Sequence, residues 1–148
     1  MSIHILTSNE KKRILESLSE RFGISEIPQL LLRFGKGKIR GFSGSLSRNE
    51  ISRLVRNVRV ELIGLYILRE ESDAYRISHD GLFVFKNAEK NVVDIPDEQA
   101  EKWLKGQDIE TNLEEGWVLL KNKNDLIGCG KVKNGKILNF VPKERRVF

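Results

Sequence analysis

The sequence has few of the residues that usually carry covalent or metal chemistry. Its 148 residues include one cysteine and two histidines. A single cysteine excludes an internal disulfide framework and any zinc site built from several cysteines, and it agrees with a reducing compartment. Because no cluster of Asp, Glu, His or Cys has the spacing of a metal site, we expect neither a metal nor another cofactor.

Long apolar runs and a leader segment are also missing. No run approaches the roughly 20 apolar residues that cross a bilayer, and the opening MSIHILTSNEKKR lacks the apolar core of a signal peptide. We therefore expect a cytoplasmic protein with no membrane partner. The runs PQLLLRF, VELIGLYIL and GWVLL exclude wholesale disorder, and the length suffices for one domain or two small ones that share an interface.

The net charge of +5 is unevenly distributed. A first basic block, from Arg33 to Arg59, has eight basic side chains against one acid, and residues 61–115 carry fourteen acids and six bases. A second basic block, from Lys121 to Arg146, has eight bases against two acids. One block alone is most simply a solvated face. Two blocks, each interleaved with structure-forming residues, favour a surface that binds a polyanion.

Two capping boxes predict helices in the first half of the chain. Thr7 and Glu10 have the capping-box spacing before an apolar helical repeat over residues 8–22, and Gly23 follows as a stop signal. Ser47 and Glu50 repeat this spacing before a second helix. The predicted apolar face of this helix consists of Ile51, Leu54, Val55 and Val58. Arg48, Ser52 and Arg56 line the edge of that face.

Strands are predicted between and after these helices. QLLLRF and KIRGFS form a hairpin that turns at the glycines of GKG, and VRVELIGLYIL and AYRIS predict further strands. Ser78 then predicts the cap of a short helix. In that helix we place three side chains in the core: Leu82, Phe83 and Phe85.

The character of the sequence changes near Lys90, where we place a domain boundary. NVVDI predicts a strand, Pro96 opens a helix over DEQAEKWLKG, and DIE returns to extended chain. Three strand candidates follow, GWVLLKN, LIGCGKV and KILNFV, separated by the turn signals NKND and KNG. Short strands at such even spacing predict a small barrel or a curled sheet.

The familiar catalytic motifs do not fit. In GCGKVKNG, Lys133 stands where a dinucleotide loop needs its third glycine, and FGKGK lacks P-loop spacing, so we interpret these glycines as turn and bulge residues. Cys129 has no histidine near it in sequence and is better interpreted as a small buried side chain than as a nucleophile. We therefore do not expect an enzyme.

The C-terminal segment CGKVKNGKILNFVPKERRVF is instead suited to binding. Lys131 and Lys133 both point outward if Val132 points inward, and Asn139 can read a base edge or a ribose. Lys143, Arg145 and Arg146 follow Pro142. Trp103 and Trp117 are better explained as core residues than as stacking platforms.

The order of elements in the last third resembles a known RNA-binding module. The segment carries WLKG, GWVLL, IGCGKV, NGKILN and PKERR in that order over about residues 91–146. It is similar to the PUA domain, in the version that ends Sun-type rRNA cytosine-5 methyltransferases. The methyltransferase catalytic domain, with its cofactor loop and paired cysteines, has no counterpart in the chain, so we do not expect methylation by this chain itself.

The preceding part resembles the α/β domain that comes before PUA in small archaeal and eukaryotic ribosome-biogenesis factors. Together the two resemblances imply an α+β protein: a pre-PUA-like α/β domain in residues 1–90 and a PUA-like β pseudo-barrel in residues 91–148. They also imply a complete two-domain protein rather than a fragment.

The resemblance also implies an RNA-binding surface, formed by the loop after the PUA helix and by the late strand and tail. Carried over, the loop is Lys105, Gly106 and Gln107, and the strand and tail supply Asn139, Lys143, Arg145 and Arg146. We add Lys131 and Lys133 from the second basic block, and Lys38, Arg40, Arg48 and Arg56 from the first.

These observations predict a non-catalytic protein that binds structured rRNA or tRNA. It would act in ribosome biogenesis or rRNA processing, or as the companion of an RNA-modifying enzyme or of ribosome-assembly proteins. The alternative is a protein-interaction adaptor within an RNA-processing or ribosome-assembly complex, docking through its acidic middle or a basic face.

Overall fold

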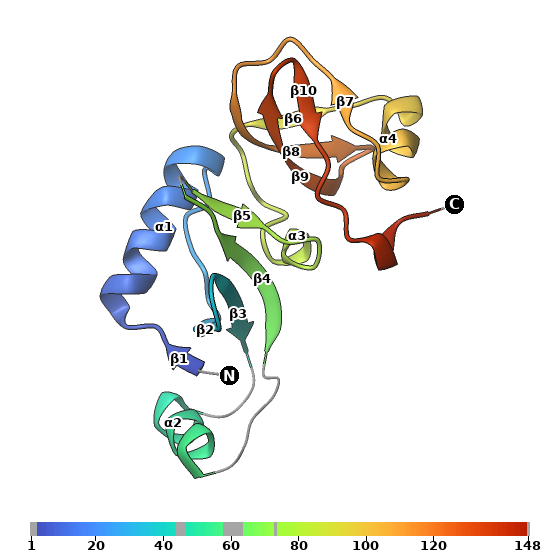
Figure 1. Cartoon of the computed structure of the whole chain (residues 1–148). Coiled ribbons are helices and arrows are strands. Elements are labelled where there is room, and N and C mark those ends of the chain that lie inside the picture. Colours follow the sequence, from blue (N-terminus) through green and yellow to red (C-terminus); the bar gives the residue numbers. More distant parts are fainter. Residues whose placement is uncertain (1–2, 44–46, 58–63, 73, 148) are drawn as a thin grey trace.

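Two five-stranded sheets make up the body of the molecule (Figure 1). The structure is a computed structural model that describes residues 3–43, 47–57, 64–72 and 74–147, without the side chains of residues 55–57. The first sheet has the order β1-β2-β3-β4-β5 and the second the order β6-β8-β9-β10-β7. Helices and strands thus mix within both halves, which confirms the predicted α+β class.

The first sheet is a fully antiparallel meander. The predicted hairpin is present, and its turn contains Gly35 and Gly37 at positive φ, where glycine has no Cβ penalty. Part of VRVELIGLYIL lies outside the described residues, and the rest forms the fourth strand. The strands are β1 (Ile3–Ile5), β2 (Leu30–Phe34), β3 (Lys38–Phe42), β4 (Leu65–Glu70) and β5 (Tyr75–Ile77).

Three helices accompany this sheet: α1 (Ser8–Phe22), α2 (Arg48–Asn57) and α3 (Gly81–Val84). Both predicted capping boxes are confirmed. The hydroxyl groups of Thr7 and Ser47 accept hydrogen bonds from the backbone N–H groups of Glu10 and Glu50. The carboxylates of these two glutamates accept hydrogen bonds from the backbone N–H groups of Thr7 and Ser47 in return. Ser78 is buried and holds the start of α3, accepting a 2.9 Å hydrogen bond from the backbone N–H of Gly81.

The second sheet is antiparallel except for β6, which runs parallel to β8. Its predicted strands and helix are all present, although KILNFV stops being a strand after Leu138. A 3₁₀ turn, η1 (Lys143–Arg145), follows near the C-terminus. The elements are β6 (Val92–Asp94), α4 (Asp97–Leu104), β7 (Ile109–Glu110), β8 (Gly116–Asn122), β9 (Asp125–Lys133) and β10 (Lys136–Leu138).

Strand β8 is buried on both faces and joins the two halves. Trp117 and Leu119 pack into the core of the first half, together with Cys129 from β9. Val118 and Leu120 face the opposite way, into the core of the second sheet with Trp103. This period of two lets one strand serve two cores. The predicted boundary near residue 90 therefore separates two sheets that share packed side chains, and it remains a prediction as a domain limit.

One sequence interpretation is corrected by the packing, and another gains a second physical reason. The sequence pattern places Phe83 in the core, but its side chain is 81% exposed, because the four residues of α3 turn Leu82 inward and cannot also turn its neighbour inward. Gly128 lies at a register shift of β9, where Leu120 pairs with Gly128 but Lys121 with Leu126, as expected of a bulge residue. Gly128 and Gly130 also make room for Trp103, because a Cβ on either would run into its indole. Trp103 and Trp117 are buried core residues, as expected.

Candidate nucleic-acid interface

Helix α4 brings the predicted loop residues to the surface. The helix begins after Pro96 and carries two acids in its first turn, where they complement the helix dipole. Its other end is anchored by Trp103, which is fully buried. The chain then reverses at Gly106, which has a φ of 95°. The exposed side chains of Lys105 and Gln107 therefore flank a tight turn.

Asn139 fastens this loop to the chain that follows β10. Its amide Nδ2 donates to the backbone carbonyls of Trp103 at 2.8 Å and Gln107 at 2.9 Å, and its Oδ1 accepts from the backbone N–H of Val141 at 2.8 Å. The side chain of Asp108 accepts the backbone N–H of Asn139 at 2.9 Å. These bonds occupy the amide that the sequence pattern suggests for reading a base, so the geometry gives Asn139 a positioning role.

Arg146 also holds the tail against the loop that follows α4. Its Nε donates to the carbonyl of Val141 at 3.1 Å, and the backbone N–H of Val147 donates to the carbonyl of Leu104 at 2.9 Å. The guanidinium covers Gly106 so closely that a Cβ there would collide with it. The glycine thus makes room for an arginine of the same chain, whereas the sequence suggests close approach of RNA.

The remaining tail cations lie on and next to η1. Lys143 is exposed and has no ion-pair partner in the described part of the chain. Arg145 is 2.9 Å from a carboxylate oxygen of Asp80, which precedes α3, and Lys105 is 3.2 Å from Glu101 one turn earlier on α4. Such exposed pairs contribute about 0–1 kcal/mol. These charges therefore remain available to a polyanion.

The hairpin of β9 and β10 carries the other two lysines of the second basic block. Val132 is buried, and Lys133 points outward as expected from the period of two. Lys131 is half-buried, with its Nζ 5.4 Å from the centre of the Trp117 ring. We name the loop at residues 105–107, the tail at residues 139–147 and these two lysines the C-terminal surface.

Several residues of the first basic block make contacts within the protein. Lys38 and Arg40 lie on β3, each 5.4 Å from the centre of an aromatic ring, Tyr66 and Phe34 respectively. Arg40 also donates to the carbonyl of Gly64 at 2.9 Å. Figure 1 places α2 and β3 away from β10 and α4, so the two blocks do not form one contiguous cluster.

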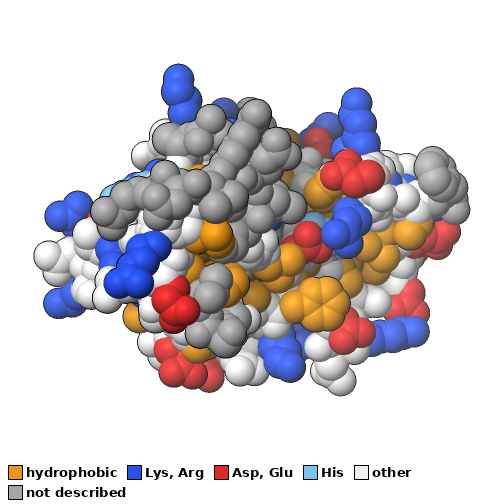
Figure 2. Space-filling view, turned by 90° about the horizontal axis from the view of Figure 1, so that it is seen from below, with side chains coloured by type: hydrophobic (Ala, Val, Ile, Leu, Met, Phe, Trp, Pro, Cys, Tyr) orange, Lys and Arg blue, Asp and Glu red, His pale blue; other side chains and the backbone are white. Residues whose placement is uncertain are grey.

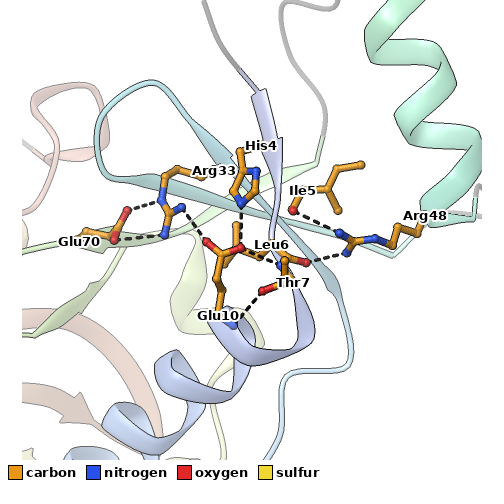
Figure 3. A network of polar contacts seen from close by, with 8 residues as sticks. All are labelled: His4, Ile5, Leu6, Thr7, Glu10, Arg33, Arg48 and Glu70. Carbon is orange, nitrogen blue, oxygen red and sulfur yellow. Dashed lines mark hydrogen bonds and ion pairs between the residues drawn. The ribbon is translucent and has the colours of Figure 1, made fainter.

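Arg48 and Arg33 are tied into the network of Figure 3. Arg48 donates to the backbone carbonyls of Leu6 at 2.6 Å and Ile5 at 3.4 Å, which attaches α2 to the end of β1. Arg33 bridges Glu70 at 2.6 Å and Glu10 at 3.2 Å. The side chain of Arg56, the fourth predicted residue of this block, lies outside what the structure describes.

Glu10 is the electrostatic centre of that network. Its pKa is lowered from 4.5 to about 2, first by the hydrogen bond from the backbone N–H of Thr7 and then by His4, whose Nε2 is 2.8 Å away.

Burial raises the pKa of the Cys129 thiol to about 12, which suits an inert core side chain. The predicted structural role of Cys129 is confirmed.

The residues that organise the C-terminal surface include two that the sequence did not reveal. Asp108 accepts a hydrogen bond from Asn139, 31 positions later in the chain. Asp80 accepts one from Arg145, 65 positions later. No local pattern signals such distant partners.

Within residues 3–43, 47–57, 64–72 and 74–147 no group of three or more His, Cys, Asp or Glu side chains is placed to hold a metal ion. The same ranges contain no helix long and apolar enough to cross a membrane.

Comparison with known proteins gives a family match for the C-terminal part of the chain. Residues 90–147 match the family model of the methyltransferase RsmF PUA domain. A ribosomal RNA small subunit methyltransferase F from Photobacterium profundum is 29% identical over 94 residues, which are 62% of this chain and 20% of that protein. The enzyme of the same name from Vibrio vulnificus is 30% identical over 98 residues, which are 65% of this chain and 21% of that protein.

A solved structure shares the overall fold. A hypothetical protein from Pyrococcus horikoshii superposes with a TM-score of 0.56 at 13% identity, covering 93% of this chain and 83% of that one. By contrast, the chain spans about a fifth of the length of the curated methyltransferases, whose catalytic domain is not part of the match. The resemblance expected from WLKG, GWVLL, IGCGKV and PKERR is confirmed: residues 90–147 match the PUA domain of the RsmF methyltransferase type.

Proposed function

We propose that this protein binds structured rRNA or tRNA through the C-terminal surface and has no catalytic activity of its own. One observation carries the proposal: in a PUA domain, Asn139 and Arg146 bring the α4 loop and the basic tail together as a single surface. A fixed loop and tail hold Lys105, Lys143 and Arg145 in one region, where phosphates can contact several of them at once.

The class of RNA process follows from the relatives. They are named as methyltransferases of small-subunit ribosomal RNA, and the similarity supports RNA binding connected with rRNA modification. We propose that this chain serves as a companion to a modification enzyme or as a ribosome-assembly factor in the cytoplasm. Binding would then position a target for a catalytic partner, because the aligned segment does not include the relatives' catalytic domain.

The salt dependence of binding tests whether the basic side chains of the C-terminal surface contact RNA phosphates. If about four to six phosphates are contacted, the log of the affinity for duplex RNA should fall with the log of the salt concentration at a slope of roughly −3 to −5. A filter-binding titration at several salt concentrations measures this slope. Binding that is independent of salt, or absent below high micromolar protein, would contradict RNA binding by this surface.

The identity of the RNA requires a second experiment. Crosslinking in cells followed by sequencing of the bound RNA should enrich rRNA or tRNA segments with defined secondary structure. A pull-down after nuclease treatment separates this role from that of a protein adaptor. Partners that persist without RNA would favour the adaptor, whereas partners that disappear with the RNA support the proposal.

A further inference from the structure

A groove of about 580 Å³ lies between α3 and the turn that joins β8 to β9. Leu82 and Phe83 line it from the first half of the molecule, and Leu104 and Ile127 from the second. Figure 2 shows hydrophobic side chains gathered over the middle of one face, with acidic and basic side chains around them. This volume lies within the roughly 300–1,000 Å³ typical of pockets for small ligands.

Phe83 is the unusual member of the groove. It is 81% exposed, the most exposed of the large hydrophobic side chains in the described part of the chain. Leu82 and Phe85 on either side of it are buried, so α3 is fixed to the core and presents this ring outward. An exposed aromatic ring beside a groove is a platform on which an unpaired base can stack.

Polar groups surround the platform at positions that suit a nucleotide. Lys86, three residues after Phe83, is exposed and can contact a phosphate. Asn124 and Asp125 line the opposite wall and can hydrogen-bond the edge of a base. The Nδ1 of His79 is buried and has no hydrogen-bond partner in the described residues. Burial lowers the pKa of His79, which favours the neutral ring.

The groove adjoins the C-terminal surface directly. Asp80, next to His79 in the chain, holds Arg145 at 2.9 Å. On the other wall, the carbonyl of Leu104 accepts the backbone N–H of Val147 at 2.9 Å. The end of the basic tail thus contacts both sides of the groove. An RNA strand that lies on the tail can place its next nucleotide in the groove, where Lys86 continues the positive charge.

We propose that the groove between α3 and the β8–β9 turn receives an unpaired nucleobase, which stacks on Phe83 while Lys86 contacts the neighbouring phosphate. The inference rests on the proposed function, because the C-terminal surface supplies the rest of the RNA contact. A nucleobase site also distinguishes unpaired from paired RNA, which phosphate contacts alone cannot do. The protein should prefer a helix that ends in, or is interrupted by, single-stranded nucleotides over a continuous duplex.

Two RNA probes separate the groove from the surface: a blunt duplex, and the same duplex with a single-stranded extension. Wild-type protein should bind the extended probe more tightly. Phe83→Ala should remove this advantage, roughly a ten- to hundredfold loss on the extended probe for one stacked base, and should leave affinity for the blunt duplex unchanged. Leu113→Ala, which removes another exposed apolar side chain, is the matched control and should keep the preference.

Phe83→Trp provides a direct reading of stacking. Trp103 and Trp117 are buried, so a tryptophan at the exposed position should dominate any quenching by bound RNA. Its fluorescence should fall with the extended probe and stay constant with the blunt duplex, and this variant should retain the preference that Phe83→Ala removes. Because the side chain is exposed, neither substitution should change the melting temperature.

The outcomes distinguish the two levels of the proposal. If Phe83→Ala keeps the preference for the extended probe, the groove is not the base site, although duplex binding would still support the proposed function. If wild-type protein binds neither probe, both proposals fail. If Phe83→Ala leaves both RNA affinities unchanged but no longer retains a protein partner in nuclease-treated pull-downs, the groove is a protein-docking site and the nucleobase proposal is overturned.

Discussion

Asn139 shows how one side chain can decide the shape of a surface without touching a ligand. Its amide makes three hydrogen bonds to backbone atoms of residues 103, 107 and 141, and each of these atoms belongs to a different segment. Gly106 and Arg146 depend on the same arrangement, because the guanidinium occupies the space that any other side chain at position 106 would need. Asn139 and Gly106 therefore shape the C-terminal surface, whereas Lys105, Lys143 and Arg145 supply exposed charge on it.

We predict that Asn139→Ala destabilises the protein by about 2 kcal/mol, because it leaves the carbonyls of Trp103 and Gln107 without their donors. Urea unfolding measures the change. Gln107→Ala is the control, since that residue contributes only a backbone carbonyl here and should stay within about 0.5 kcal/mol of wild type. Unchanged stability of the Asn139 variant, with reduced RNA affinity, would instead restore the base-reading role.

The lowered pKa of Glu10 predicts a pH-dependent contribution to stability. The folded state binds the proton less readily than the unfolded state, so the stabilisation is full above the ordinary pKa of 4.5 and is lost as the pH falls toward 2. Glu10→Gln keeps a capping-box acceptor but removes the charge. The difference in unfolding free energy between wild type and Glu10→Gln should therefore shrink between pH 4.5 and pH 2.

Chemical unfolding at a series of pH values measures that difference. Glu16→Gln is the matched control, because Glu16 is an exposed acid on the same helix that lies outside the network around Glu10. It should show a smaller dependence on pH in this window. A constant gap between wild type and Glu10→Gln down to pH 2 would mean that the ionised carboxylate contributes nothing to folding.

At the scale of elements, short sequence motifs predict those helices, caps and turns that depend on contacts between nearby residues. The helix at residues 8–22, its cap at Thr7 and the hairpin at Gly35 depend on atoms a few positions apart, and the structure confirms them. The loop-to-tail contact depends on Asn139 and partners 32 and 36 positions away, which no spacing rule encodes. The sequence therefore suggests which residues form the predicted surface, whereas the contacts that hold these residues together appear only in the structure.

Short elements limit prediction in a different way. Helix α3 has four residues, too few for a periodic pattern to show which apolar side chain faces outward. The sequence consequently predicts a core position for Phe83 as well as for Leu82 and Phe85. The sequence also interprets the glycines of GCG as turn and bulge residues alone, because nothing in it places the Trp103 indole over positions 128 and 130. In both cases tertiary packing, rather than local propensity, determines the outcome.

The tail acts as an element whose charge can be removed without unfolding it. We predict that Lys143→Ala combined with Arg145→Ala weakens RNA binding and makes the salt slope less negative by about 2, one unit for each phosphate that is no longer neutralised. The exposed Arg145–Asp80 pair contributes little to folding, so the melting temperature should stay nearly constant. Filter binding and a thermal melt measure the two effects.

Lys12→Ala with Arg13→Ala removes two exposed charges from α1 and is the matched control for net charge. An equal loss of RNA affinity in this control would show that total charge, and not the C-terminal surface, determines binding. A marked fall in the melting temperature of the tail variant would show instead that Lys143 and Arg145 are structural.

At the scale of the whole molecule, β8 couples the sheet that carries the C-terminal surface to the first half. Leu119 contributes to the first core and its neighbour Val118 to the second, and both are buried. The core of the first half therefore contains side chains from both sheets. The groove proposed for a nucleobase lies across the same junction, so its geometry depends on the junction staying closed.

This coupling predicts that Leu119→Ala destabilises both halves together, by about 2–5 kcal/mol, because its cavity opens in a core shared with Ile67 and Leu68 of β4. Amide hydrogen exchange measures this by position: protection should fall as much in β4 as in β8. Leu113→Ala, exposed in the loop before β8, should leave both unchanged. If Leu119→Ala lowers protection in β8 and β9 alone, the halves unfold separately. The predicted boundary near residue 90 would then mark two autonomous domains, and the groove between them would be free to open.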